Sequence, residues 1–232
     1  MPRLHQCLNE NRKPLSLLVS LPVNDAGLAR AALEAGADGL KVHFNVGHRA
    51  SGQHFESLDS YLDAFREIRS LFDGPLGVVP AGSLEGADAA TIRRLAPLGF
   101  DFYSIYAHHL PSHMLYDTGL DRTFAIDATY DPSLVEAAGH FGFSALEASI
   151  VPGEAYGTPL SFADVLKYRQ LVRTAQVPVI VPSQRKLVPD DVRALTDAGV
   201  KGVLLGAIVV GRSGEQIKEQ VAKFREAIDR WT

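Results

Sequence analysis

Short apolar runs alternate along the chain with longer segments of helical period. The apolar runs, each rich in Val, Ile or Leu, cover residues 15–21, 39–45, 75–80, 100–106, 123–129, 144–150, 177–182 and 202–208. Segments in which apolar residues recur every three or four positions follow them, most clearly at 25–37, 55–72, 161–175, 189–200 and 213–231. This alternation is typical of repeated βα units around a parallel sheet. The segment after the fourth run, 113–120, is short, and its type stays open.

Eight such units in 232 residues predict one (β/α)8 barrel, a TIM barrel of the α/β class, spanning residues 1–232. A doubly wound open sheet is the alternative. Asn24, Ser161 and Ser213 stand where a helix N-cap is expected. Gly36 and Gly199 stand at the C-terminal ends of the helical segments 25–37 and 189–200. No charge block or low-complexity stretch indicates a domain boundary.

Composition narrows the class of protein. The 23 Lys and Arg residues against 27 Asp and Glu residues give a net charge of −4, which argues against nucleic acid or an anionic membrane surface as a partner. No run of about 18 apolar residues predicts a membrane span. Cys7 is the single cysteine, so no internal disulfide can form and a reducing, cytoplasmic location is expected. A homo-oligomer is compatible with these features.

Alternate side chains of a strand face opposite sides, so one set points into the barrel and the other meets the helices. In the second run the apolar set Leu40, Val42 and Phe44 belongs to the helix side. The same alternation assigns these side chains to the interior: Ser20, Lys41, His43, Asn45, Ser104, Tyr106, His108, Asp127, Thr129, Glu147 and Ser149. They gather toward the C-terminal ends of the strands, where active sites of this fold lie.

Lys41 is the most informative of these inward residues. A buried lysine or carboxylate is costly without a partner, so an interior that keeps several of them indicates a site. In one interpretation Lys41 is a base or a Schiff-base amine, with Glu147 or Asp127 as its proton partner. In the other, the same residues form a structural ion pair without turnover.

The C-terminal quarter carries a specific resemblance. In residues 177–212 a proline-led strand precedes a short loop, a helix that starts at a Pro-Asp pair, and a strand that ends in Gly-Ala. The matching residues are Pro178, Pro189, Asp190, Gly199, Gly202, Gly206 and Ala207. This tract resembles the seventh and eighth βα units of the ribulose-phosphate-binding barrels, which include phosphosugar epimerases, indole-glycerol-phosphate synthase and isomerases of the histidine and tryptophan pathways.

The resemblance implies a phosphate site, in which backbone N–H groups of both loops and a short helix N-terminus surround the dianion. The implied ligands are Ser183, Gln184, Arg185, Gly206 and Ala207. The family often has a Gly-Gly or Glu-Gly pair in loop seven, where this chain has 183–186. Ser183 would then donate a hydrogen bond, and Arg185 or Lys186 would supply charge. The alternative is that the tract only closes the barrel.

Two further resemblances concern the predicted catalytic end. The tract 37–48 is similar to the strand-two motif of ribulose-phosphate 3-epimerase, which holds a divalent metal through a His and an Asp. Lys41 and His43 occupy those two positions here. Segments 125–129 and 157–165 resemble N-acetylmannosamine-6-phosphate epimerase. The lysine after strand three and the glutamate after strand seven that this family uses are absent, so its mechanism does not carry over.

Histidines and two loops add candidates. Six of the eight histidines lie at or beyond the ends of strands two and four: His43, His48, His54, His108, His109 and His113. In an extended segment His108 and His109 point in opposite directions and cannot both bind one metal, so acid–base work by one histidine is favoured over a divalent metal site. The loop after strand six carries Tyr156, as a lid or a plain connection. The loop after strand two carries Arg49, which meets a second anionic group, apart from the phosphate, or solvent.

These features together predict an enzyme that acts on a small phosphorylated metabolite by proton abstraction next to a carbonyl, as an isomerase, an epimerase or an aldol-type lyase. The predicted catalytic residues are Lys41 as base or amine, Glu147 and Asp127 as proton partners, and His43, Tyr106 and His108 as polarising groups. No cofactor is expected, although a divalent metal stays open. The alternative is a non-catalytic or regulatory barrel that binds a phosphorylated ligand or flavin phosphate.

Overall fold

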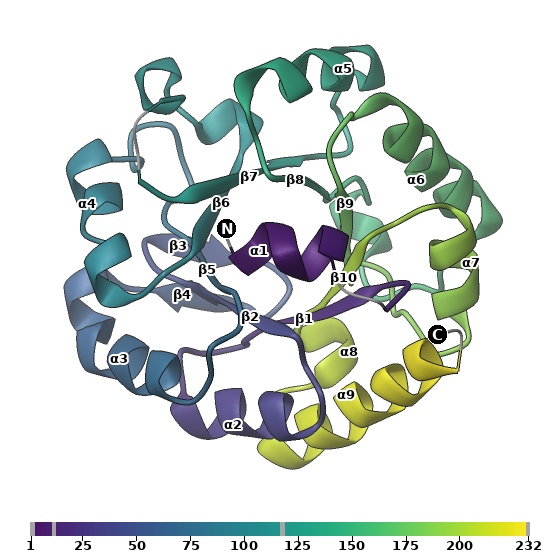
Figure 1. Ribbon diagram of the computed structural model, residues 1–232, viewed down its shortest axis with the longest axis horizontal. Coiled ribbons are helices and arrows are strands. Elements are labelled where there is room, and N and C mark those ends of the chain that lie inside the picture. The colour runs from purple at the N-terminus through teal and green to yellow at the C-terminus, as the bar shows by residue number, and fades with distance from the viewer. Residues whose placement is uncertain (1–2, 11–12, 117–118, 231–232) are drawn as a thin grey trace.

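The computed structural model describes residues 3–10, 13–116 and 119–230, and a closed barrel of eight parallel strands forms its centre (Figure 1). The strands are β1 (Ser16–Ser20), β2 (Gly39–His43), β5 (Leu76–Val79), β6 (Phe102–Tyr106), β7 (Asp121–Ile126), β8 (Ala145–Ala148), β9 (Val179–Pro182) and β10 (Gly202–Leu205). The ring closes at β1, which pairs with β10 on one side and with β2 on the other. The predicted (β/α)8 barrel is confirmed, and the open sheet is wrong.

Helices surround the barrel on its outside (Figure 1). They are α2 (Ala26–Glu34), α3 (Leu62–Ser70), α4 (Ala89–Arg93), α5 (Val135–Ala138), α6 (Phe162–Thr174), α7 (Asp191–Asp197), α8 (Ala207–Val210) and α9 (Gly214–Asp229). Short helical turns join them: η2 (Leu58–Tyr61), η3 (Ala96–Leu98), η4 (Ala107–His109), η5 (Ser112–Met114), η6 (Pro132–Leu134), η7 (Gly139–Phe141) and η8 (Gly153–Ala155). Of the expected segment 113–120, residues 117–118 lie outside the described residues, as does Trp231 at the end of the last expected helix.

Helix ends follow the predicted local signals with one exception. Ser161 and Ser213 each form a capping box, in which cap and third helical residue exchange hydrogen bonds. The glycines that end α2 and α7 have φ angles of 99° and 87°, as a left-handed end requires. The prediction for Asn24 is wrong, because the next residue, Asp25, caps α2 by accepting a hydrogen bond from the Leu28 amide.

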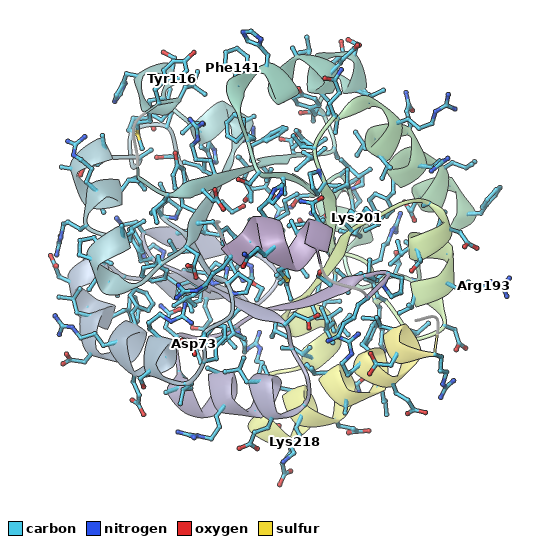
Figure 2. All side chains as sticks on the ribbon, in the orientation of Figure 1. Asp73, Tyr116, Phe141, Arg193, Lys201 and Lys218 are labelled. Carbon is cyan, nitrogen blue, oxygen red and sulfur yellow. The ribbon has the colours of Figure 1, made fainter. Side chains whose placement is uncertain are left out.

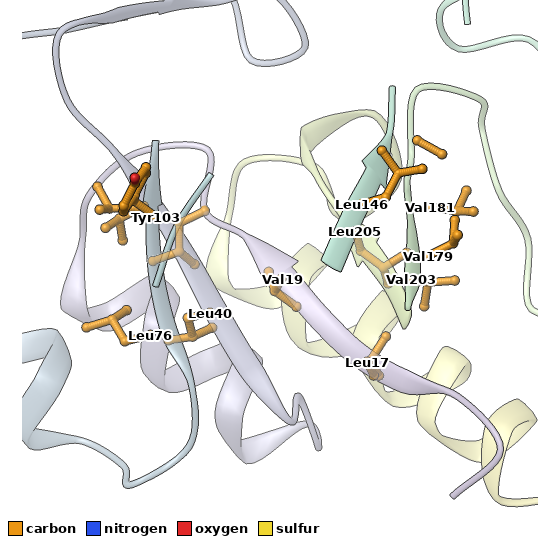
Figure 3. Packing of buried hydrophobic residues seen from close by; sticks show 14 of the residues in the cluster. Leu17, Val19, Leu40, Leu76, Tyr103, Leu146, Val179, Val181, Val203 and Leu205 are labelled. Atoms are coloured by element: carbon orange, nitrogen blue, oxygen red, sulfur yellow. The ribbon is translucent and has the colours of Figure 1, made fainter. Parts of the chain in front are cut away.

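The two faces of the strands carry the side chains that the alternation predicts. Outward residues such as Leu40, Tyr103 and Leu146 are buried with the helices in one continuous core (Figure 3). Asn45 is an exception to the predicted inward set, since its side chain is exposed. The reason is that β2 ends at His43 and the chain then turns away, with Asn45 at a φ of 50°.

The N-terminal end of the barrel is closed by a segment to which sequence analysis gives no role. α1 (Arg3–His5) and η1 (Gln6–Glu10) lie across the centre of the ring (Figure 1). Leu4 and Leu8 pack there against inward-facing apolar side chains. The cluster consists of Leu4, Leu8, Leu18, Phe102, Ala145, Ile180 and Leu204. The barrel interior is therefore apolar at this end, and its polar side chains lie toward the other.

A short antiparallel hairpin follows β2, where sequence analysis expects a loop, and its last residue, Phe55, is the first residue of the expected helix 55–72. Its strands are β3 (Val46–His48) and β4 (Gln53–Phe55). The ring of His43 stacks on Phe55, with centroids 4.8 Å apart, and lies 4.4 Å from the ring of His48. These buried ring contacts attach the hairpin to the end of β2, so the helical segment starts only at η2.

Charged side chains cover the outside of the helix ring. Lys218 and Arg193 project away from the barrel in Figure 2. Lys218 Nζ lies 3.3 Å from Glu34 Oε2, so this ion pair links α9 to α2. Within the described ranges, no helix is both long enough and apolar enough to cross a bilayer.

Candidate active site

A cavity of about 580 Å³ lies at the C-terminal ends of the strands, between hairpin β3–β4 and the loop that follows β8. It brings together all six predicted catalytic residues: Lys41, His43, Tyr106, His108, Asp127 and Glu147. Of the predicted phosphate ligands, Ser183, Gln184 and Gly206 line the cavity, whereas Arg185 and Ala207 do not. The volume falls within the range of about 300–1,000 Å³ that is usual for small-molecule sites.

Lys41 on β2 and Glu147 on β8 form an ion pair across the barrel interior. Lys41 Nζ lies 2.8 Å from Glu147 Oε1 and 2.7 Å from Oε2. The carboxylate accepts a third hydrogen bond at its Oε2 from Ser104 Oγ on β6, at 2.9 Å. The lysine and glutamate side chains are only 6% and 10% exposed, so water screens their charges little. Of the two carboxylates that sequence analysis offered to Lys41, Glu147 is the one that holds it.

His43 is fully buried beside this pair. Its Nε2 lies 3.3 Å from Ser20 Oγ, and its Nδ1 has no hydrogen-bond partner within the described part of the chain. The Asn24 side chain clamps its backbone, donating to the His43 carbonyl at 2.6 Å and accepting from the His43 amide at 3.1 Å. Burial, followed by the neighbouring His48 and Lys41, lowers the pKa of His43 well below its ordinary value. The imidazole is therefore neutral, and Asn24, expected as a helix cap, instead positions it.

Tyr106 and Asp127 differ in protonation. Burial raises the pKa of Tyr106 to about 12, despite a side-chain hydrogen bond with Ser149, so the phenol keeps its proton and can donate a hydrogen bond to an oxyanion. Burial alone would raise the pKa of Asp127, but hydrogen bonds from the Thr129 hydroxyl and amide outweigh it and lower that pKa. Asp127 is ionised and lies 3.9 Å from Nδ1 of His108, with both side chains partly in solvent.

Sequence analysis placed His108 and His109 in an extended segment on opposite sides, and this prediction is wrong. The two residues form the turn η4, their ring centroids are 4.2 Å apart, and both line the cavity. Among residues 3–10, 13–116 and 119–230, no group of three His, Cys, Asp or Glu side chains could hold a metal ion.

The ends of β9 and β10 meet at the side of the cavity where the phosphate site is predicted. Ser183 Oγ accepts a hydrogen bond from the Gly206 amide at 2.7 Å. A Cβ added at Gly206 would lie 3.7 Å from Ser183 Oγ and 4.0 Å from Ser20 Cβ. A methyl group there would fit without a clash but would occupy space between two residues that line the cavity.

Gln184 has a different role from the predicted one. Its Nε2 donates to the Ser149 carbonyl at 3.1 Å and to the Tyr156 hydroxyl at 2.6 Å, and its Oε1 accepts from the Val151 amide at 3.0 Å. Both donors of the amide are therefore engaged. Gln184 fixes the loop after β8 against β9 and has no donor left for a phosphate.

The prediction that Arg185 supplies charge to a phosphate does not fit its contacts. Its Nε and Nη2 lie 3.0 Å from the two carboxylate oxygens of Asp164, and its Nη1 donates to Thr158 and Ala155. Asp164 belongs to the capping box of α6, so the guanidinium is held at that helix end and outside the cavity. Ala207, the first residue of α8, also lies outside the cavity wall.

The closed parallel barrel with its surrounding helices makes the chain a (β/α)8, or TIM-barrel, protein. No protein-family model matches the sequence, and no curated protein matches it. Solved structures match its fold along nearly the whole length.

Thiamine phosphate pyrophosphorylase from Pyrococcus furiosus is similar with a TM-score of 0.66 and 16% identity, over 94% of this chain and 98% of that one. Tryptophan synthase from Mycobacterium tuberculosis is similar with a TM-score of 0.73 and 14% identity, over 97% and 96% of the two chains. A structure from Aquifex aeolicus is similar with a TM-score of 0.71 and 13% identity, over 98% of each chain. At these identities the likeness concerns the fold.

Proposed function

We propose that the protein is an enzyme that acts on a small phosphorylated carbonyl compound and moves a proton next to the carbonyl, as an isomerase, an epimerase or an aldol-type lyase. The observation that carries the proposal is the buried Lys41–Glu147 pair in the wall of an open cavity. One fold neighbour, thiamine phosphate pyrophosphorylase, is named for a phosphorylated compound, which supports this substrate class by analogy.

In this proposal Lys41 is the reactive amine. Its Nζ gives a proton to Glu147, which already lies at hydrogen-bond distance, and the neutral amine adds to the substrate carbonyl. Loss of water then leaves an imine, and the protonated imine nitrogen withdraws electrons from the adjacent carbon. A proton or a carbon–carbon bond on that carbon becomes easier to break. The protonated phenol of Tyr106 and the neutral imidazole of His43 supply hydrogen bonds to the substrate oxygen on which negative charge develops during the reaction.

Trapping the imine tests this chemistry. The purified protein is incubated with glycolaldehyde or with glyceraldehyde 3-phosphate in the presence of cyanoborohydride, which reduces an imine to a stable secondary amine. Peptide mass spectrometry should find the adduct at Lys41, and Lys41→Met should abolish it. Lys167→Met, which removes an exposed lysine on α6, is the matched control and should leave the adduct in place.

The phosphorylated aldehyde should react faster than glycolaldehyde at equal concentration, because the phosphate would bind beside Ser183 and Gly206. Gly206→Ala fits the backbone without a clash, so we expect it to remove this preference while the fold and the glycolaldehyde reaction are kept. No adduct at Lys41 with either aldehyde would refute the amine role.

A non-catalytic barrel that binds a phosphorylated ligand is the second candidate, and one observation favours it. Lys41, Glu147 and Ser104 hydrogen-bond one another, as the members of a purely structural group would. This candidate predicts phosphate-dependent thermal stabilisation without an adduct at Lys41.

A further inference from the structure

The cavity wall contains little free positive charge. Histidines apart, its cationic side chains among the described residues are Lys41 and Arg49. Lys41 is neutralised by Glu147, and Arg185 of loop seven is held by Asp164 outside the cavity. Arg49 forms no ion pair with a carboxylate in the described part of the chain. Among the residues that the structure describes, it is therefore the one fixed cation of the wall that remains available to an anionic ligand.

Arg49 lies at the turn of hairpin β3–β4 and reaches toward the loop after β8. Its guanidinium carbon is 6.0 Å from the centroid of the Tyr156 ring. A Cβ added at Gly153 would come 1.7 Å from Arg49 Nη1, so a side chain at this position would force the guanidinium to move from where it lies. The Tyr156 hydroxyl is bound by Gln184, the neighbour of Ser183. These contacts place Arg49 on the side of the mouth where β8, β9 and the Ser183–Gly206 contact lie.

The hairpin turn is anchored on two sides, which positions Arg49 before a ligand arrives. Ser51 is fully buried, and its hydroxyl lies 2.8 Å from His48 Nδ1. Its carbonyl accepts a hydrogen bond at 2.6 Å from Nη2 of Arg212, which lies between α8 and α9. The hairpin is thus attached to the end of β2 through His48 and to the β10 side of the barrel through Arg212.

From this geometry we propose that Arg49 is the specificity-determining residue of the site and binds the phosphate group of the substrate over the Ser183–Gly206 contact. A planar guanidinium can donate two parallel hydrogen bonds to phosphate oxygens. The proposal rests on the proposed function only in taking the substrate to be phosphorylated. It assigns to the β3–β4 hairpin the charge that sequence analysis expected from loop seven.

Calorimetric titration with inorganic phosphate tests the proposal. Arg49→Gln should weaken phosphate binding by about tenfold or more, because it removes hydrogen bonds between two charged groups, which are stronger than those between neutral ones. Arg49→Lys should restore part of the loss, since it keeps the charge without the paired donors. Gly153→Ala keeps every charge but displaces the guanidinium, so it should weaken binding, though less than Arg49→Gln does. Added salt should weaken binding to the unchanged protein.

Two matched controls accompany these variants. Arg30→Gln removes an exposed arginine on α2, and Gly214→Ala adds a methyl group at the start of α9, where the nearest atom would be 3.7 Å away. Both should bind phosphate as the unchanged protein does. Phosphate affinity unchanged in Arg49→Gln and in Gly153→Ala, or no phosphate binding by the unchanged protein, would overturn the role of Arg49.

The failure of this inference can be told apart from the failure of the proposed function. Glycolaldehyde carries no phosphate, so its reaction with Lys41 in the unchanged protein tests the amine chemistry independently of phosphate binding. An adduct at Lys41 with phosphate binding that is indifferent to Arg49 would refute only the inference. Arg49-dependent phosphate binding without any adduct would refute only the amine chemistry.

Discussion

Replacing Lys41 by methionine should separate the structural from the catalytic contribution of the Lys41–Glu147 pair. The variant leaves the Glu147 carboxylate, which is 10% exposed, with Ser104 as its remaining side-chain hydrogen-bond donor in the described structure. Removing one partner of a buried pair typically lowers the free energy of unfolding by about 3–5 kcal/mol. For a chain of this length, that loss corresponds to a fall in Tm of about 10 °C. Glu147→Met should cost a similar amount, because it leaves the ammonium group of Lys41 buried instead.

The double variant Lys41→Met/Glu147→Met should regain most of this stability. Two apolar side chains of similar volume replace the charges, and the remaining cost is about 1 kcal/mol for the acceptor that Ser104 loses. Urea unfolding of the four proteins, analysed as a double-mutant cycle, measures the coupling free energy. Single variants that lose less than about 1 kcal/mol would show that water screens the pair as it does on a surface, and the reasoning would be wrong. A double variant that is no more stable than the less stable of the two single variants would also refute this reasoning.

Three further predictions concern stability. Burial, followed by the charge of Lys41, lowers the pKa of His48 to about 4 from its ordinary 6.5. Between these two pH values the unfolded chain binds a proton at His48 that the folded protein does not, so the free energy of unfolding should fall by about 3 kcal/mol as the pH is lowered from 6.5 to 4. Urea titrations of His48→Gln should lack that part of the fall. Gly77→Ala should cost about 1–3 kcal/mol, because its Cβ would lie 2.1 Å from the Phe102 ring; an unchanged Tm would contradict this. Leu4→Ala should cost about 2–5 kcal/mol if the N-terminal segment is part of the barrel core, and urea unfolding that matches the unchanged protein would show that it is not.

The barrel and its inward-facing polar residues could be predicted because both follow from local periodicity. A period of two fixes which side of the strand each residue faces, and a closed parallel sheet leaves only two environments for those sides. Lys41 and Glu147 were therefore both assigned to the interior. Their pairing was not predicted over a pairing with Asp127, because β2 and β8 are not neighbours in the ring. Which residues meet across the barrel depends on strand tilt and on where each strand ends.

Other features were missed because their signals are short or have a second interpretation. Leu4 and Leu8 are the apolar pair that closes the barrel, but one helical turn of spacing is too little for a periodicity. Phe55 fits the helical pattern that follows it, although it ends β4 and stacks on His43. Arg185 lies in the predicted phosphate loop, and only the folded chain shows that Asp164 neutralises it.

The depth at which the Lys41–Glu147 pair lies links the stability of the barrel to its chemistry. Lys41 is the middle residue of β2, and the pair lies between the apolar cluster around Leu4 and the open cavity. An apolar pair at this depth would extend the cluster and hold the barrel nearly as well, because charges lose their hydration when they are buried. Under the proposed function the charged pair has a role at the floor of the cavity, where Glu147 would take the proton that Lys41 must lose. A double variant whose stability lies within about 1 kcal/mol of the unchanged protein, but which forms no adduct with glycolaldehyde, is the outcome this reasoning requires.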